Sequence, residues 1–374
     1  MSDTSDASFP SSKMRLNGIC PYFTMFPLEF PLTVLREHAE AGQVLVDPFC
    51  GRGTSNFAAR LMGISSFGID SSPVATAISQ AKLSAATPHA IERALAYILR
   101  HAPEPKDVPQ GEFWEWSFAP KTLIDLCKIR EALLISCRTD ARIALRGIIL
   151  GALHGPVNKT GKASYLSNQS PRTYAPKPAY AVRFWRARNM NPPEADIKII
   201  TSLRAARYYG DLPNSNGGKI IQADSRDRSA FRVSGTARAH WIITSPPYYG
   251  MRTYIPDQWL RNWFVGGPAK VDYSNHRQLE HKSPAEFSRQ LRQVWVNAAR
   301  RCHPGARLVI RFGGINNRKA DPESILLESL QDAPWRLESL SSAGIPANNR
   351  RQSSHFLKQN ASPIEEFDLC ARLL

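Results

Sequence analysis

The stretch Trp241–Gly250, with the sequence WIITSPPYYG, is the most informative part of the chain. It begins as a short apolar, β-branched run, which is typical of a buried parallel strand. Pro246 and Pro247 then end the strand, because proline fixes φ and has no N–H for the ladder. The stiff loop that follows carries the Ser245 hydroxyl, free carbonyl groups and the Tyr248 ring. These groups suit a planar ring with an amino substituent, since they offer hydrogen-bond acceptors and a stacking surface.

The composition favours a folded protein that binds a polyanion. The chain has 374 residues, enough for one large domain or two modest ones, and 43% of them are hydrophobic. Lysine and arginine total 48 against 32 acidic residues, which gives a formal net charge of +16. This charge favours nucleic acid as the partner, with a basic protein that binds none as the alternative. A membrane is not expected, because no apolar run is long enough to span one.

Neither a metal site nor a disulfide framework is predicted. The six cysteines are scattered and include no CxxC pair. His276 and His281 lie in a polar stretch without acidic or cysteine partners at ligand spacing, so both are expected on the surface. Residues 1–17 are expected to form a flexible polar tail. Residues 1–13 lack a basic-then-apolar signal, and with the cysteine pattern this predicts a reducing, cytoplasmic location.

Two strand patterns near the start of the chain predict a nucleotide-type ligand site. Residues 43–54, QVLVDPFCGRGT, indicate a strand, a glycine-containing turn and a helix that opens at Thr54 or the next residue. Gly51 and Gly53 allow the backbone to turn tightly and to approach a ligand. A second strand follows and ends at Asp70, where an acid suits the hydroxyl groups of a ribose.

A large insertion separates the second strand from the third. The next convincing strand, residues 218–224, lies far beyond the few tens of residues that a compact sheet allows. Residues 85–217 are therefore an insertion, helical at first and then basic, aromatic and irregular. Interleaved cations and aromatics suit phosphate contact and base stacking, and a solvated basic loop with packed aromatics is the alternative. The residues expected to bind nucleic acid are Lys159, Lys162, Arg172, Tyr174, Lys177, Arg183, Arg186 and, after the central strand, Arg252.

The predicted strand ends point to a single ligand crevice. Further strands are expected at residues 305–313, 335–340 and 365–373, the last two as an antiparallel hairpin. The sequence thus predicts an α/β fold with a doubly wound, Rossmann-like sheet that is mostly parallel. Such a sheet binds ligands at the carboxyl ends of its strands. The side chains expected at those ends are Asp47, Asp70, Asp224 and Ser245.

The local motifs resemble those of S-adenosylmethionine-dependent methyltransferases that modify amino groups in DNA. Asp47-Pro-Phe-Cys-Gly-Arg-Gly-Thr is similar to their motif I, Gly-Ile-Asp70-Ser-Ser-Pro to motif II, and Ser245-Pro-Pro-Tyr to motif IV. Phe26-Pro27 before a helix loosely resembles motif X, and Asp224 resembles the motif III acid. The serine version of motif IV resembles the cytosine-N4 group of restriction–modification methylases. The resemblance covers roughly residues 20–84 and 218–313.

The resemblance implies a methyltransferase fold with S-adenosylmethionine as the cofactor. Asp47 and the two glycines would line the methionine part, Asp70 would hold the ribose, and Ser71 and Asp224 would lie at the adenine. Residues 18–84 would form the cofactor-binding half, and residues 218–374 the catalytic half. The implied cofactor-binding residues are Phe26, Pro27, Asp47, Pro48, Phe49, Gly51, Gly53, Thr54, Asp70, Ser71 and Asp224.

The resemblance also implies a site-specific DNA methyltransferase acting on N4 of a flipped-out cytosine. The Ser245 hydroxyl and the Pro246 carbonyl would accept hydrogen bonds from the amino group, and Tyr248 would stack on the base. The catalytic residues are then Ser245, Pro246, Pro247 and Tyr248. Methylation of a ring carbon would instead need a nucleophilic cysteine, and the sequence has no Pro-Cys pair. Double-stranded DNA is the expected partner, and the resemblance allows a cognate restriction endonuclease that acts on the same site.

Two alternatives to cytosine-N4 methylation stay open. The same fold could methylate adenine N6 or an amino group in RNA, although those enzymes more often carry Asp or Asn at the place of Ser245. A protein that keeps the fold and binds nucleic acid without catalysis is the second alternative. The intact motifs argue against it, and failure to bind S-adenosylmethionine in calorimetry would favour it.

Overall fold

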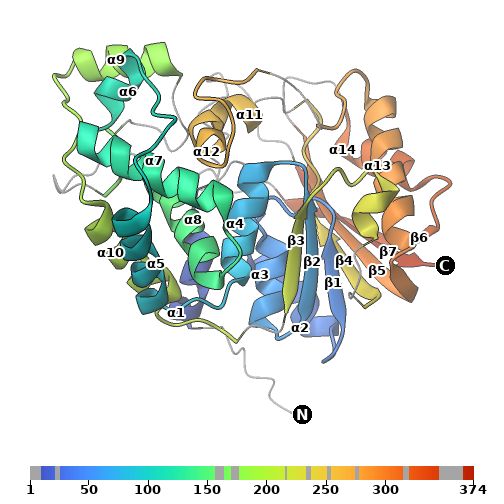
Figure 1. Ribbon diagram of the computed structural model, residues 1–374. Coiled ribbons are helices and arrows are strands. Elements are labelled where there is room, and N and C mark those ends of the chain that lie inside the picture. Colours follow the sequence, from blue (N-terminus) through green and yellow to red (C-terminus); the bar gives the residue numbers. More distant parts are fainter. Residues whose placement is uncertain are drawn as a thin grey trace.

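One seven-stranded sheet with helices on both faces forms the centre of the protein (Figure 1). The structure is a computed structural model that describes residues 10–21, 26–155, 164–169, 177–214, 217–232, 237–250, 254–273, 278–314, 320–344 and 365–374. The strands are β1 (Val44–Asp47), β2 (Ser65–Asp70), β3 (Gly218–Gln222), β4 (Ala239–Thr244), β5 (Cys302–Gly313), β6 (Trp335–Gly344) and β7 (Glu366–Leu373). Across the sheet their order is β3-β2-β1-β4-β5-β7-β6.

The pairing of the strands confirms the predicted fold class. Strands β3, β2, β1, β4 and β5 are parallel, and β7 runs antiparallel to both β5 and β6. Alternate residues of the central strands face two different cores, Leu45 and Ile243 on one side and Val46 and Ile242 on the other. Because both faces are covered, these strands are apolar runs without a polar face.

Two layers of helices cover the sheet. The first core contains residues of α2 (Glu29–His38), α3 (Thr54–Leu61) and α4 (Pro73–Leu83), and the second contains residues of η2 (Arg228–Phe231), α13 (Pro284–Ala299) and α14 (Pro322–Leu330). Helix α4 begins where the sequence specifies it. The Ser72 hydroxyl accepts a hydrogen bond from the Ala75 N–H at 3.3 Å, and Pro73 occupies the first turn.

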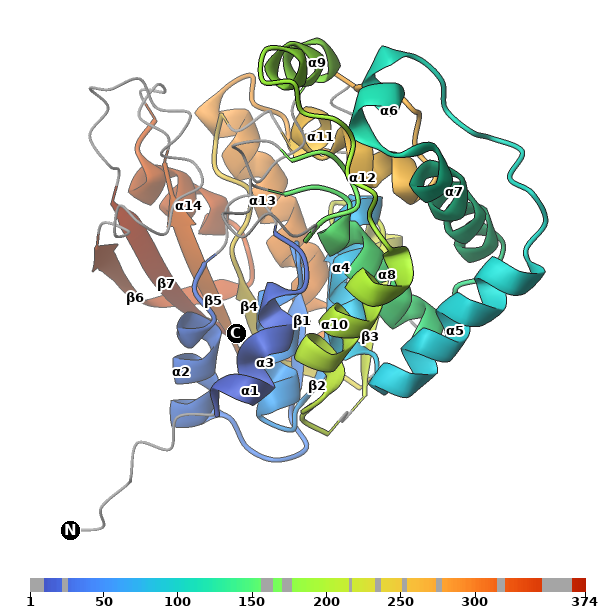
Figure 2. The ribbon, with the colours of Figure 1, turned by 90° about the vertical axis from the view of Figure 1, so that its left-hand side faces the viewer.

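The described residues between α4 and β3 form a block of helices beside the sheet. Its helices are α5 (Pro88–His101), α6 (Glu112–Ser117), α7 (Pro120–Ile135), α8 (Asp140–Ala152), α9 (Pro178–Arg186) and α10 (Ile197–Tyr209). Figures 1 and 2 place this block on the side of the sheet away from β6 and β7. Two short helices that follow β4, α11 (Tyr254–Asp257) and α12 (Trp259–Phe264), belong with it. The rings of Trp114 and Trp263 lie 4.6 Å apart, and Arg130 Nε donates to the Trp263 carbonyl at 2.8 Å.

The N-terminal segment differs from the flexible tail expected over residues 1–17. Residues 10–17 are described, and they include α1 (Ser11–Met14) and the start of η1 (Arg15–Gly18). Leu16 is only 1% exposed, because it packs into the first core, and the Asn17 side chain accepts a hydrogen bond from Lys82 Nζ at 2.7 Å. Along the described part of the chain, no helix is both long and apolar enough to cross a bilayer.

Candidate active site

The carboxyl ends of four adjacent strands, β3, β2, β1 and β4, form the candidate site. They lie at the upper edge of the sheet in Figure 1. Side-chain and backbone hydrogen bonds tie neighbouring ends together. The Thr244 hydroxyl donates to Asp47 Oδ1 at 2.6 Å, and the Ala223 N–H donates to the Asp70 carbonyl at 3.0 Å. The structure therefore brings Asp47, Asp70, Asp224 and Ser245 to one edge, as the strand pattern predicts.

The glycine loop after β1 is held against the end of β2. The Gly51 and Ser72 N–H groups each donate to one oxygen of the Asp70 carboxylate, at 2.9 and 2.8 Å. Gly51 has a φ of +51°, and a Cβ there would meet only the Phe49 carbonyl, at 3.9 Å. Its outer surface is thus open to a ligand. Gly53 has a φ of +73° and packs against Ser79 of α4. Its lack of a side chain allows the start of α3 to approach α4 closely.

Asp47 is a fully buried acid with an incompletely satisfied carboxyl group. Oδ1 accepts hydrogen bonds from the Thr244 hydroxyl and, at 3.1 Å, from the Phe49 N–H. Oδ2 is buried and has no hydrogen-bond partner. Burial raises the pKa of Asp47 to about 7, although the bond from Thr244 opposes the shift. The Ser55 hydroxyl also opposes the shift, although neither it nor Oδ2 makes a hydrogen bond of normal geometry. The negative charge of Asp47 beside a glycine loop would attract a cationic ligand group.

The pKa of Asp70 is also raised by burial, but less than that of Asp47. Burial raises the pKa of Asp70 to about 6, and the two backbone N–H donors limit the shift because they favour the carboxylate. Both of its oxygens already accept a hydrogen bond, and each keeps further acceptor capacity. A ribose hydroxyl therefore fits as an additional donor to this carboxylate.

The other residues expected around the cofactor fall into two groups. Pro48 and Thr54 are buried, and the Pro48 carbonyl accepts a hydrogen bond from the Ser225 hydroxyl. Phe49 and Ser71 are half-buried, with the Phe49 ring packed edge-to-face on Trp295. Contact of any of these side chains with a cofactor stays a prediction.

Asp224 lies just beyond β3 and is paired with an arginine that the sequence did not single out. Arg226 Nη2 lies 2.6 Å from Asp224 Oδ2, and Arg226 Nε bonds both carboxylate oxygens at 3.0 and 3.1 Å. Gln290 of α13 holds the far side of the guanidinium at 2.8 Å. An adenine amino group bound to Asp224 as predicted would therefore share the carboxylate with Arg226.

The motif X residues lie beside the end of β5. Phe26 and Pro27 are half-buried, and the Phe26 ring packs edge-to-face on Phe30 at 5.7 Å between centroids. The Arg311 guanidinium of β5 lies 4.0 Å from the centre of the Phe30 ring. This stacking ties the start of α2 to the same edge of the sheet as the other motifs.

The Ser245–Tyr248 loop begins one residue after β4 ends. Ser245, Pro247 and Tyr248 are half-exposed, and Pro246 is buried. Its far end is fixed by His281, whose Nδ1 accepts a hydrogen bond from the Gly250 N–H at 2.9 Å.

The expectation that His281 lies on the surface is wrong. His281 is 9% exposed, because its ring stacks on Phe287 and holds the motif IV loop. His276 lies outside the described residues.

Three of the cations expected to bind DNA can be located. Arg183 is exposed on α9, and Arg186 is exposed but paired with Glu112. Lys177 lies 3.3 Å from the buried Asp257. Helix α9 is at the same end of the molecule as the carboxyl ends of the parallel strands (Figures 1 and 2). The remaining predicted contacts lie outside the described residues: Lys159, Lys162, Arg172, Tyr174 and Arg252.

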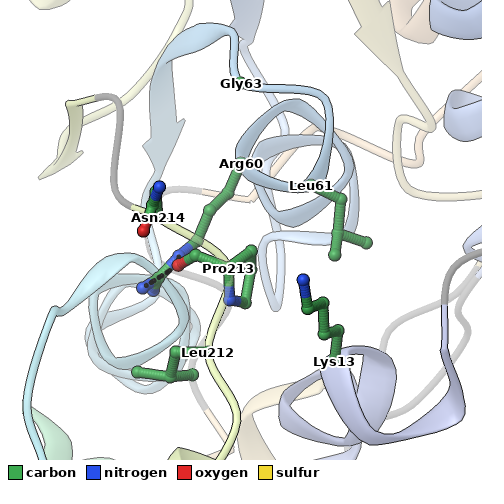
Figure 3. Close-up of a pocket in the computed structure, with 7 residues that line it drawn as sticks. All are labelled: Lys13, Arg60, Leu61, Gly63, Leu212, Pro213 and Asn214. Atoms are coloured by element: carbon green, nitrogen blue, oxygen red, sulfur yellow. Dashed lines mark hydrogen bonds between the residues drawn. The ribbon is translucent and has the colours of Figure 1, made fainter.

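A separate pocket of about 300 Å³ lies at the opposite edge of the sheet (Figure 3). It is formed where α1, the end of α3 and the segment before β3 meet, and Lys13 and Arg60 supply its charge. The Arg60 guanidinium donates to the backbone carbonyls of Lys82, Ser84 and Pro213, so it holds loops together. No motif residue lines this pocket.

Comparisons with known proteins give a short sequence match and broad structural likenesses. No protein-family model matches the chain. A type II methyltransferase from Methanocaldococcus jannaschii is 38% identical over 69 residues, which are 18% of this chain and 13% of that protein. The chain therefore matches only a small part of that relative's length.

Two solved structures illustrate the structural likenesses. A SAM-dependent methyltransferase from Methanosarcina mazei aligns over 94% of this chain and 99% of its own, with 10% identity and a TM-score of 0.35. An rRNA methyltransferase from Streptomyces viridochromogenes aligns over 98% and 94%, with 13% identity and a TM-score of 0.35. Likeness at this level carries no inference about the activity of this chain.

Proposed function

We propose that this protein is an S-adenosylmethionine-dependent methyltransferase that acts on an exocyclic amino group of a base in DNA, with cytosine N4 as the target. The observation that carries the proposal is the convergence of four motif elements at one sheet edge. Thr244, the residue before Ser245, donates directly to Asp47, so a hydrogen bond joins the two strand ends that lead into the predicted base-binding loop and the predicted cofactor loop. The short match to a type II methyltransferase supports the same class.

The residues on the cofactor side fit such a ligand. The negative charge of the buried Asp47 carboxylate suits a nearby cationic amino group, and the open surface at Gly51 leaves room along the loop. Asp70 at the end of β2 suits the ribose hydroxyls. When bound, S-adenosylmethionine supplies an electrophilic methyl group on sulfur.

The residues of the motif IV loop would prepare the target nitrogen. An exocyclic amino group is a poor nucleophile, because its lone pair is delocalised into the ring. Hydrogen bonds from that group to the Ser245 hydroxyl and the Pro246 carbonyl would favour a tetrahedral nitrogen and localise the pair. Tyr248 would hold the base by stacking, so that much of the acceleration comes from orientation. In duplex DNA the base must first be flipped out.

The product of the reaction tests this proposal. The protein is incubated with S-adenosylmethionine and mixed-sequence duplex DNA, and the digested nucleosides are analysed by mass spectrometry. N4-methylcytosine is the expected product. N6-methyladenine would keep the mechanism and correct the base, and methylated RNA in a parallel reaction would correct the polymer. No methylated nucleoside from either polymer would overturn the proposal.

Replacement of Ser245 separates chemistry from cofactor binding. We expect Ser245→Ala to lower kcat by about a hundredfold, since it removes an acceptor used in the transition state. The dissociation constant of S-adenosylmethionine, measured by calorimetry, should stay within about twofold of wild type. Equal losses in both quantities would contradict the role given to Ser245.

A further inference from the structure

The C-terminal strand β7 brings two carboxylates to the candidate active site. Glu366 lies opposite Gly313, and Asp368 lies opposite Arg311, in the antiparallel pairing of β7 with β5. Residues two apart on a strand share one face of a sheet, so both acids face the same side. Neither belongs to any of the motifs in the sequence.

Glu366 is bonded to the aromatic residue of the motif IV loop. The Tyr248 hydroxyl donates a hydrogen bond to Glu366 Oε1 at 2.7 Å. The same ring packs edge-to-face on Phe312 of β5, with 5.5 Å between centroids. A hydrogen bond from a phenol to a carboxylate is charge-assisted and stronger than one between neutral groups. The ring of Tyr248 is therefore held at its hydroxyl by Glu366 of β7 and by packing against Phe312 of β5.

Gly313 at the end of β5 provides the space for this contact. A Cβ at this position would lie 2.9 Å from Glu366 Cγ and 3.3 Å from two ring atoms of Tyr248. Any larger residue would therefore displace the Glu366 side chain and crowd the Tyr248 ring.

Asp368 forms a second anchor on the motif X side. It accepts hydrogen bonds from Arg311 Nε and Nη2 at 2.7 and 2.6 Å, in the bidentate arrangement typical of arginine and a carboxylate. The same guanidinium stacks on Phe30, which contacts Phe26. Strand β7 thus supports the aromatic groups on both sides of the end of β5.

We propose that Glu366 is a positioning residue that fixes the plane of the Tyr248 ring for the base that stacks on it. The proposal rests on the proposed function and adds a residue to it. Without the carboxylate, the ring keeps its stacking surface and loses the bond that orients it. The target nitrogen is then misaligned with the methyl group, which lowers the rate of chemistry and leaves cofactor binding intact.

A double-mutant cycle on the full-length protein tests this inference. The variants are Tyr248→Phe, Glu366→Ala and the combination of both, with kcat and the KM of each substrate measured. Each single variant should lower kcat by about tenfold or more, because each removes one charge-assisted hydrogen bond. The double variant should be no slower than the slower single one, and the KM of S-adenosylmethionine should not change.

Two further variants sharpen the comparison. Glu366→Gln keeps an acceptor oxygen and should recover most of the activity lost in Glu366→Ala. Glu365→Gln is the matched control, since Glu365 is exposed on the same segment and accepts a hydrogen bond from Ser342. It should be as active as wild type. If Glu366→Ala does not fold, as judged by circular dichroism, Gly313→Ala replaces it in the cycle, because it displaces the same two side chains.

Distinct outcomes would overturn the two proposals. Losses that multiply in the double variant, or a raised cofactor KM together with lowered kcat, would overturn the positioning role alone. Wild-type protein that transfers no methyl group to DNA or RNA would overturn the proposed function and the positioning role with it.

Discussion

Asp47 is a buried carboxyl group whose charge changes near neutral pH. Its pKa is raised to about 7 by burial, so below pH 7 most molecules carry it protonated. Only the carboxylate attracts a cationic ligand group. We therefore expect the affinity for S-adenosylmethionine to rise about tenfold per pH unit up to pH 7 and to level off above it. Calorimetric titrations between pH 5.5 and 8.5 measure this dependence.

Asp47→Asn provides the control for that titration, because it removes the charge and keeps the shape. Its affinity for S-adenosylmethionine should be low and independent of pH across the same range. A variant with the wild-type pH dependence would exclude Asp47 as the titrating group.

The free energy of unfolding of the ligand-free protein should instead decrease as the pH rises. Because the pKa of Asp47 is about 7 in the folded protein and close to the usual 3.8 in the unfolded chain, the unfolded chain loses its proton first as the pH rises. Stability is then lost between these pH values, by up to about 1.4 kcal/mol per unit.

The sequence could predict where the local motifs lie, but not the contacts between residues far apart in the chain. Gly51, Asp70 and Ser245 could be placed because each follows a short apolar strand, and parallel strands end at one edge. The bond between Tyr248 and Glu366 joins residues 118 apart, and it depends on the register of β7 on β5. No local pattern specifies that register. His281 was misplaced for a similar reason, since its polar neighbours conceal the ring contact with Phe287.

At the level of elements, α12 couples the motif IV loop to the helical block. Trp263 is fully buried against α6 and α7, and its carbonyl accepts the bond from Arg130. Arg261 of the same helix donates to the Leu150 carbonyl of α8 at 3.0 Å. Helix α12, which follows the motif IV loop in the chain, is therefore built into the helical block.

Removing the Trp263 side chain tests this coupling. We expect Trp263→Ala to lower the free energy of unfolding by about 3–5 kcal/mol, as for other buried tryptophans. Amide hydrogen exchange should become faster in α6 and α7 as well as in α12, because the three share one core. Trp335→Ala, in the core on the other face of the sheet, is the matched control and should leave exchange in α6 and α7 unchanged. Faster exchange confined to α12 would contradict the coupling.

At the level of the whole molecule, the net charge of +16 gives any polyanion a general attraction to the protein. If the field of the whole molecule attracts the DNA, replacing one cation should have a similar small effect wherever it lies. If a local surface contacts the DNA, the effect should depend on the position of the cation. Exposed cations at the site end of the molecule, such as Arg183 on α9, would contact phosphates directly under the proposed function. Lys219 is also exposed but lies at the amino end of β3, the opposite edge of the sheet. Each can be replaced by glutamine with the same change in net charge.

The salt dependence of DNA binding distinguishes the two cases. If α9 faces the DNA, Arg183→Gln should reduce the slope of log K against log salt by about one, because one phosphate contact is lost. Lys219→Gln should leave the slope within error of wild type. Fluorescence anisotropy with a labelled duplex at several salt concentrations measures both. Equal, small effects from the two variants would mean that binding reflects the field of the whole molecule, and the DNA face would then lie away from α9.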